Sequence, residues 1–156
     1  MRIHIHDQKA RREILRELDE RDQKNTAIPN GNPDPHRLLV VDDDPTFRKL
    51  VRGRAEQRNF TVIEAGSLAE VKSIATPNLF DVAIVDYFID DAKSPAVGTE
   101  VAEELDYTPT VLVSGSDDCV QTFPAWGPSI RRFCSKDWGV EKILNEAISI
   151  QRPSKR

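Results

Sequence analysis

The sequence lacks long apolar runs, and its 156 residues include only two cysteines. Its longest uninterrupted apolar runs are about four residues, far below the roughly 20 that a membrane-spanning helix needs. The first residues, MRIHIHDQKARRE, contain no apolar stretch of the kind found in a signal peptide. Cys119 and Cys134 show no paired spacing, which fits a reducing compartment. These absences predict a cytoplasmic protein with no membrane partner. Cys134 lies in an apolar segment and is expected to be a small buried side chain.

An excess of basic charge is also absent, because the formal net charge is −4. This balance argues against nucleic acid as a partner. Residues 38–156 carry 14 Lys/Arg and 19 Asp/Glu, whereas residues 1–37 carry 8 and 7. With 38% apolar residues, a chain of this length can fill one core. We therefore expect one acidic domain, preceded by a highly charged but nearly neutral extension.

Residues 8–24 of the extension have the pattern of a short amphipathic helix, with a narrow apolar stripe of Ile14, Leu15 and Leu18. Such a stripe cannot stabilise a helix alone. The sequence leaves open whether this helix docks on the domain, binds a partner or forms a dimer. Residues 25–36 contain three Pro and one Gly among polar residues, which is typical of a linker. We assign residues 1–36 to the extension, 37–150 to the domain and 151–156 to a basic tail.

From residue 38 onward, short apolar segments alternate with helical patterns, as in an α/β protein. This alternation predicts right-handed crossovers and a doubly wound, parallel five-stranded sheet with helices on both faces. Prolines at 124 and 128 allow only a short or irregular fourth helix. The expected strands are 38–41, 60–65, 81–86, 110–114 and 130–134, and further helices are expected around 97–105 and at 140–150.

The first helix of the domain has a clear start signal. Asp44 can cap its N-terminus, and Pro45 suits its first position. The residues expected to face the core from this helix are Phe47, Leu50, Val51 and Ala55.

Polar residues follow four of the five expected strands. Parallel strands present their carboxyl ends at one edge, where such folds bind ligands. Three carboxylates gathered there would raise one another's pKa unless a cation lay among them, and oxygen ligands of this kind suit Mg²⁺. A hydroxyl and an ammonium group suit the remaining oxygens of a phosphoryl group, which an aspartate can accept as a nucleophile. The residues at this edge are Asp42 and Asp43, Asp86, Ser114, and Lys136.

In their order and spacing these motifs resemble the receiver domains of two-component response regulators, over residues 38–150. The family places an acid pair after strand one, an acceptor Asp after strand three, Ser or Thr after strand four and Lys after strand five. The matching segments are VVDDD, AIVDYF, VLVSG and FCSKD, with intervals of 43, 28 and 22 residues from Asp43 through Asp86 and Ser114 to Lys136. The resemblance implies a CheY-like, flavodoxin-like (βα)5 fold.

The resemblance also implies a role for each residue. Asp86 would take a phosphoryl group from a histidine kinase or phosphotransfer protein, and Ser114 and Lys136 would bind the phosphoryl oxygens. Phe133 would be the aromatic residue whose rotamer follows the movement of Ser114 when the protein switches. The ligands of Mg²⁺ would be Asp42, Asp43, Asp86 and the backbone carbonyl of Phe88. Apart from self-phosphorylation and slow self-dephosphorylation, no enzymatic activity is expected.

Three features depart from the family pattern or limit the output. Asp137 follows Lys136, where most relatives have a proline in a cis peptide. The segment 115–129 is broken by proline and glycine. Only 20 residues follow Lys136, too few for an output domain, so we expect signalling through contact with a downstream protein target. The helix at 8–24 and the last strand–helix face are the two candidate dimer surfaces.

Two alternatives remain at this stage. One is a degenerate receiver that acts only as a binding module. The other is a phosphatase of the haloacid-dehalogenase type, whose nucleophile motif resembles Asp42-x-Asp44-x-Thr46. The phosphatase would need a second acid pair after Lys136, which the sequence lacks, and it would leave Asp86 without a role. The residue that carries the phosphoryl group distinguishes the receiver from the phosphatase.

Overall fold

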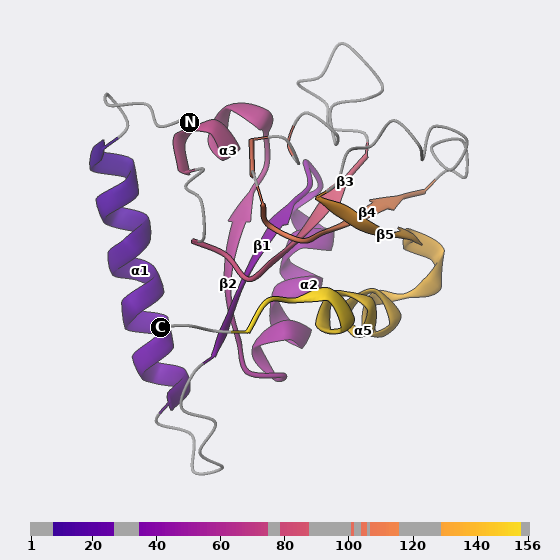
Figure 1. Cartoon of the computed structure of the whole chain (residues 1–156), viewed down its shortest axis with the longest axis horizontal. Helices are drawn as coiled ribbons and strands as arrows, with labels where there is room; N and C mark the ends of the chain where they lie inside the picture. Colours follow the sequence, from indigo (N-terminus) through magenta and orange to yellow (C-terminus); the bar gives the residue numbers. More distant parts are fainter. Residues whose placement is uncertain are drawn as a thin grey trace.

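A computed structural model describes residues 8–26, 35–74, 79–87, 101, 104–105, 107–115 and 129–153. Five strands form one parallel sheet in the order β2-β1-β3-β4-β5 (Figure 1). Their bounds are β1 His36–Val41, β2 Phe60–Ala65, β3 Val82–Asp86, β4 Thr110–Ser114 and β5 Ile130–Ser135. The predicted α/β fold is confirmed, and every predicted strand lies within two residues of an observed one.

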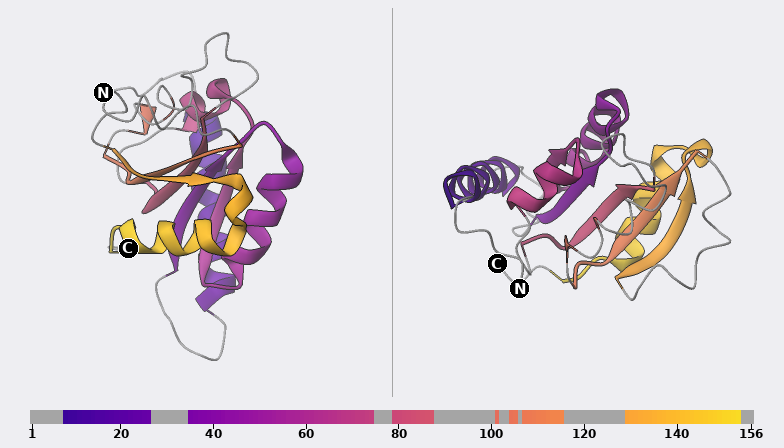
Figure 2. Two further views of the ribbon diagram at one scale, coloured as in Figure 1. Left: turned by 90° about the vertical axis from the view of Figure 1, so that its right-hand side faces the viewer. Right: turned by 90° about the horizontal axis from the view of Figure 1, so that it is seen from above.

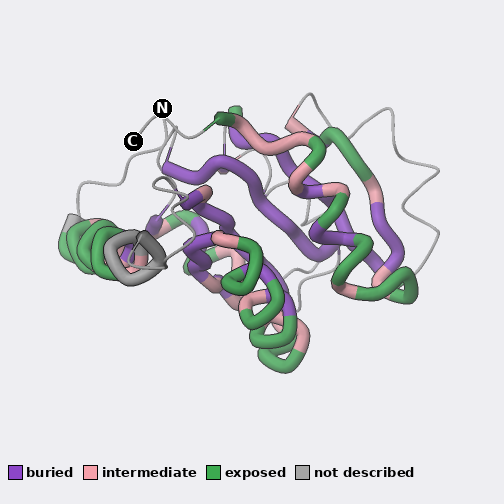
Figure 3. The backbone as a smooth tube through the Cα atoms, turned by 90° about the horizontal axis from the view of Figure 1, so that it is seen from below, coloured by how far each residue is buried: buried purple, intermediate pink, exposed green. Residues whose placement is uncertain are grey.

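The strands are apolar because both faces of the sheet are covered. All residues of β3 and β4 are buried, as expected for central parallel strands. In Figure 3 the strands β1 to β4 are nearly continuous buried segments, whereas the helices are exposed on their outer sides. Cys134 of β5 is fully buried, as predicted, and burial raises the pKa of its thiol to about 11.

Among the described residues, four α-helices cover the two faces of the sheet. On one face, α2 (Pro45–Glu56) and α5 (Val140–Ile150) pack Val51, Ala55 and three residues of α5 into the core. On the other, α1 (Gln8–Thr26) and α3 (Leu68–Ile74) contribute to a second core cluster. In Figure 2, α1 lies beside the sheet, away from α5.

The start of α2 agrees with its sequence signal. Asp44 is its N-cap, with Oδ1 accepting a hydrogen bond from Thr46 N at 3.0 Å, and Pro45 begins the helix. The predicted stripe is wrong at Leu50, whose residue surface is 49% exposed. The buried face of α2 is centred on Val51 and Ala55, and Leu50 lies at its margin, on the side open to solvent.

The predicted N-terminal helix docks along β2 (Figure 1). Leu18 is fully buried in the second cluster, and the Arg21 guanidinium donates a hydrogen bond to Val62 O. Arg37 Nη2 lies 3.4 Å from Asp19 Oδ1. The apolar stripe is narrower than predicted, because Leu15 is 44% exposed. Docking is thus the outcome observed among the options the sequence left open, and dimer formation stays a prediction.

The residues after α5 return to the sheet. Arg152 N donates to Asp81 O at 3.0 Å, and Arg152 Nη1 donates to Tyr107 O at 3.2 Å. These bonds fix residue 152, in the predicted basic tail, beside the start of β3.

Several predicted features lie outside the described residues. They include Phe88, the irregular fourth helix and most of the helix expected around 97–105. Of that last helix, Val101, Glu104 and Leu105 are described, and Val101 and Leu105 are buried. Within the described parts of the chain, no helix combines the length and apolar character that crossing a membrane requires.

The docking of α1 leads to a first prediction. Leu18→Ala should lower the free energy of unfolding by about 2–4 kcal/mol, because it removes a fully buried side chain. Urea denaturation followed by circular dichroism would measure the change. Leu15→Ala, on the same helix but 44% exposed, is the matched control and should have a much smaller effect. Equal losses in the two variants would show that α1 does not dock through Leu18.

Candidate functional site

Three carboxylates meet at the carboxyl edge of the sheet. Asp42 and Asp43 follow β1, and Asp86 ends β3, the neighbouring parallel strand. Val41 is in register with Val85, so the next residues, Asp42 and Asp86, lie side by side. One carboxylate oxygen from each acid lies within 4.8 Å of the others. Asp42 and Asp86 are buried, while Asp43 is half-buried.

Asp42 is held by the backbone that follows it. Its Oδ1 accepts a hydrogen bond from Asp44 N at 2.9 Å. Its Oδ2 is buried and accepts no hydrogen bond of good geometry from the described residues. The ammonium of Lys136 lies 2.8 Å from that oxygen.

Lys136 supplies the positive charge of the cluster. It begins a short 3-10 helix, η3 (Lys136–Trp138), which Ser135 caps by accepting a hydrogen bond from Asp137 N at 3.2 Å. Lys136 Nζ also lies 3.4 Å from Asp86 Oδ2 and 4.8 Å from the centre of the Phe47 ring. The described residues contain no cis peptide bond, so the Lys136–Asp137 peptide is trans. Lys136 therefore reaches the acids although Asp137 replaces the proline of most relatives.

The pKa values of Asp42 and Lys136 depend on the burial of both groups and on their contact with each other. Burial raises the pKa of Asp42, and the nearby Lys136 and the Asp44 amide offset this only in part. Burial by itself would lower the pKa of Lys136, but contact with Asp42 and the charge of Asp86 outweigh it and leave that pKa raised. Lys136 is therefore charged at neutral pH and acts as the local counter-ion of the acids.

Ser114 and Phe133 lie on the adjoining strands. Ser114 is fully buried and ends β4, one residue beyond Val113, which is in register with Asp86. Phe133 on β5 is half-buried and contacts the Trp138 ring edge-on, with centroids 6.4 Å apart. The structure thus brings the three acids and Lys136 into contact and places Ser114 at the same edge.

The acid cluster fits Mg²⁺. This ion favours oxygen ligands, keeps several waters and is bound by one or two carboxylates together with phosphate oxygens. Three carboxylate oxygens within 4.8 Å of one another carry more negative charge than the one ammonium beside them, Lys136, offsets, and a bound cation would balance it. Asp42, Asp43 and Asp86 would hold the ion, while Phe88 lies outside the described residues.

The sequence reasoning missed two neighbours of the site. Phe47 was expected to face the core, but its ring also contacts the Lys136 ammonium. Arg48 was not considered, yet its Nη1 donates to the Asp42 carbonyl at 2.5 Å. The sequence did offer one indication of this contact: Arg48 lies one turn into the helix that follows the acids, close enough for its side chain to reach them.

Comparison with known proteins identifies the family. A family profile described as "Response regulator receiver domain" matches residues 38–148. The chain belongs to this family. It is therefore a CheY-like receiver domain of two-component signalling, as the order and spacing of its motifs suggested.

Solved receiver structures share the fold. The non-phosphorylated HemR receiver domain from Leptospira biflexa is 24% identical, with a TM-score of 0.60, covering 76% of this chain and 98% of that one. Chemotaxis response regulator CheY4 of Vibrio cholerae is 19% identical, with a TM-score of 0.62 and coverage of 74% and 98%. The receiver domain of Francisella response regulator 1452 is 16% identical, with a TM-score of 0.61 and coverage of 74% and 95%. A comparison with curated proteins finds no match.

Crowding of the acids leads to a second prediction. In metal-free buffer, Asp43→Asn should raise the free energy of unfolding by about 1 kcal/mol, because it removes one of three like charges. The raised pKa of Asp42 means that ionising this residue costs stability as the pH rises through that pKa. The gain should therefore shrink towards acidic pH, where the Asp42 carboxyl is protonated and no longer repels its neighbour. Urea denaturation in EDTA at several pH values would measure it.

Asp44→Asn is the control for this experiment. Asp44 is exposed, and asparagine also caps helices, so this variant should be nearly as stable as the wild type. A loss of stability in Asp43→Asn would contradict the idea that repulsion dominates the metal-free site.

Proposed function

We propose that this receiver domain accepts a phosphoryl group on Asp86 from a histidine kinase or a phosphotransfer protein. Mg²⁺ would be bound by Asp42, Asp43, Asp86 and the Phe88 carbonyl. The observation that supports this most strongly is the contact of Lys136 Nζ with Asp86 Oδ2 and Asp42 Oδ2, at 3.4 and 2.8 Å. This contact brings together the proposed nucleophile Asp86, the proposed metal ligand Asp42, and Lys136, whose ammonium can bind phosphate oxygens.

The chemistry can be written with these groups. A carboxylate oxygen of Asp86 attacks phosphorus as the P–N bond of the donor phosphohistidine breaks, and the imidazole nitrogen leaves with the bonding electrons. Bound Mg²⁺ would offset the negative charge that gathers on the oxygens. The Lys136 ammonium, already beside Asp86, neutralises the incoming phosphoryl group, and the Ser114 hydroxyl donates a hydrogen bond to it. The product is an acyl phosphate on Asp86.

The output is contact with a downstream protein target. In this proposal Ser114 moves towards the phosphoryl group, and Phe133 changes rotamer with it. Phe133 contacts Trp138, which is 46% exposed, so a change at Phe133 alters the molecular surface. An exposed aromatic side chain such as Trp138 is a typical contact for a binding partner.

The geometry disfavours the two alternatives. A phosphatase of the haloacid-dehalogenase type would use Asp42 as nucleophile and Asp44 as acid–base, but the Asp44 side chain caps α2. It would also leave Asp86, which lies 3.4 Å from Lys136 Nζ, without a role. A degenerate receiver would be expected if replacing proline with Asp137 displaced Lys136, yet Lys136 contacts both acids.

A third prediction tests the proposal directly. Incubation with acetyl phosphate and Mg²⁺ should add the mass of one phosphoryl group to the intact protein, as measured by mass spectrometry. EDTA and Asp86→Asn should each abolish the adduct, because the first removes the ion and the second removes the nucleophile. Borohydride reduction and peptide sequencing would locate the modified residue.

Asp44→Asn is the matched control, since it removes an acid of the same triplet but keeps a capping side chain, and it should be phosphorylated normally. A phosphoryl group on Asp42 would support the phosphatase instead. If neither acetyl phosphate nor the donor kinase produces an adduct in a folded protein, the degenerate receiver is correct.

A further inference from the structure

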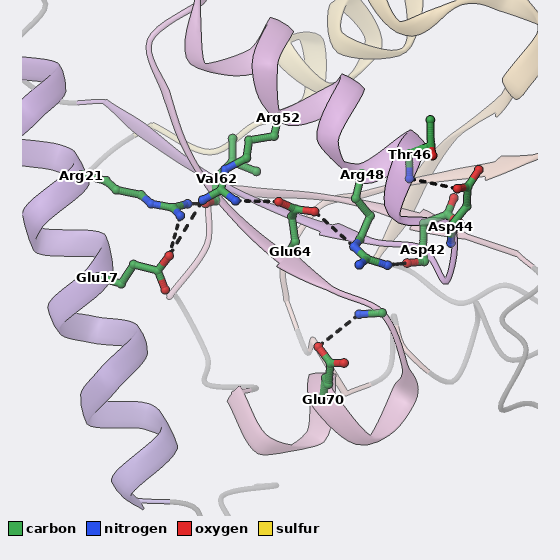
Figure 4. Close-up of polar contacts among 11 residues, drawn as sticks. Glu17, Arg21, Asp42, Asp44, Thr46, Arg48, Arg52, Val62, Glu64 and Glu70 are labelled. Atoms are coloured by element: carbon green, nitrogen blue, oxygen red, sulfur yellow. Dashed lines mark hydrogen bonds and ion pairs between the residues drawn. The ribbon is translucent and has the colours of Figure 1, made fainter.

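We propose that Arg48 is a positioning residue for the metal-binding acids, and that the N-terminal helix α1 reaches it through a chain of ion pairs. Figure 4 shows this chain, which runs from α1 to α2, then to β2 and back to α2, and ends at the acids. Its members, in order from α1, are Glu17, Arg52, Glu64, Arg48 and the backbone carbonyl of Asp42. The inference rests on the proposed function insofar as those acids are taken to hold Mg²⁺.

The link at the site is between Arg48 and the loop that carries the acids. Arg48 Nη1 donates to Asp42 O at 2.5 Å. The backbone N of Arg48 also donates to Asp44 O at 3.2 Å, in the first turn of α2. The guanidinium of Arg48 therefore holds the start of the segment 42–44, while the ordinary backbone hydrogen bond of the helix holds its end. Because Asp43 lies within that segment, this contact limits where its carboxylate can point.

Glu64 determines where the Arg48 guanidinium lies. Its Oε1 is 3.2 Å from Arg48 Nε, and its Oε2 is 2.6 Å from Arg52 Nη1. Arg48 and Arg52 are four residues apart, so they lie on the same face of α2. The side chains of Glu64 and Arg48 are only 15% and 19% exposed, so water screens this pair less than a surface pair. Glu64 is the one charged residue of β2, and it bridges two turns of α2.

Gly66 leaves the space that this arrangement needs. A Cβ added to Gly66 would lie 3.0 Å from Arg48 Nη1. A side chain at position 66 would therefore require the guanidinium to shift by a few tenths of an ångström. Because Gly66 has no side chain, the Arg48 guanidinium can lie close to its backbone and reach the loop that carries the acids.

The last link connects α1. Glu17 Oε1 lies 2.5 Å from Arg21 Nη2 and 3.9 Å from Arg52 Nη2. Arg21 in turn donates to Val62 O on β2, two residues before Glu64. The Glu17–Arg52 pair is partly exposed and contributes little alone. Its effect comes from the docking of α1, which holds Glu17 beside Arg52.

The consequence is a coupling between α1 and the metal site. When α1 is docked, Glu17 helps to orient Arg52, which leaves Glu64 correctly placed for Arg48. Coupling between two sites is reciprocal, so an ion held by the acids also favours the docked position of α1.

The test has a readout in the metal-free, full-length protein. Amide hydrogen exchange measured by NMR reports the opening of the loop 42–46, and the amides of β4 report the stability of the sheet. Glu64→Gln should speed exchange of the loop amides about tenfold with little change in β4. Gly66→Ala should act in the same direction by displacing the guanidinium, and it is a second variant that leaves every charge in place.

The α1 link is tested with a matched pair of variants. Glu17→Gln should speed exchange of the same loop amides about threefold. Glu13→Gln, one turn earlier on α1, removes the same charge from a residue that does not pair with Arg52, and it should leave the loop unchanged. Isothermal titration with Mg²⁺ should show weaker binding in the same order of variants.

The outcomes separate the two claims. Loop exchange equal to wild type in both Glu64→Gln and Gly66→Ala would overturn the positioning role of Arg48. Equal effects of Glu17→Gln and Glu13→Gln would overturn the link to α1. Faster exchange throughout β4 would mean a merely structural role and would also overturn the proposal. If the wild type binds no Mg²⁺, the proposed function fails, while the exchange data still decide whether the chain of ion pairs positions the loop.

Discussion

Repulsion among three carboxylates at one edge of the sheet is the constraint on which the rest of this structure depends. Their oxygens lie within 4.8 Å of one another, and two of the three acids are buried. Such a cluster persists only when positive charge and hydrogen-bond donors surround it. Lys136 provides the charge, and the Asp44 amide provides a donor. The parallel register of β1 with β3 makes the crowding unavoidable, because it fixes Asp42 beside Asp86.

The two edges of the sheet are protected in different ways. Edge strands offer unpaired backbone groups to other chains. At β2, α1 lies alongside, and Arg21 satisfies the Val62 carbonyl. At β5, Arg131 and Arg132 are exposed, and charged side chains discourage pairing with another strand. The extension therefore has a structural role at one edge of the domain whether or not it also meets a partner.

The strands and the convergence of the site residues could be predicted because they depend on local patterns. Four-residue apolar runs mark buried strands, and parallel register then brings the residues that follow them to one edge. Leu15 and Leu50 were misplaced because a helical stripe predicts a face only to within one residue, and packing decides the rest. Arg48 with Glu64 and Arg21 with Val62 join residues 16 and 41 positions apart. No local pattern predicts such pairs, since they depend on how α1 and α2 lie against β2.

The position of Lys136 links the chemistry to the surface. Its ammonium is shared between Asp42 and Asp86, while its backbone begins η3, which ends at the exposed Trp138. Under the proposed function, a phosphoryl group on Asp86 competes with Asp42 for this ammonium, because it carries more negative charge than the carboxylate it replaces. Any shift of Lys136 towards the phosphoryl oxygens must be absorbed by the short helix that it begins. Trp138, which contacts Phe133 and lies 5.1 Å from Lys142 Nζ, belongs to that helix. Under the proposed function, the residue that would neutralise the phosphoryl group is thus covalently connected, over two residues, to an exposed aromatic side chain that a partner could contact.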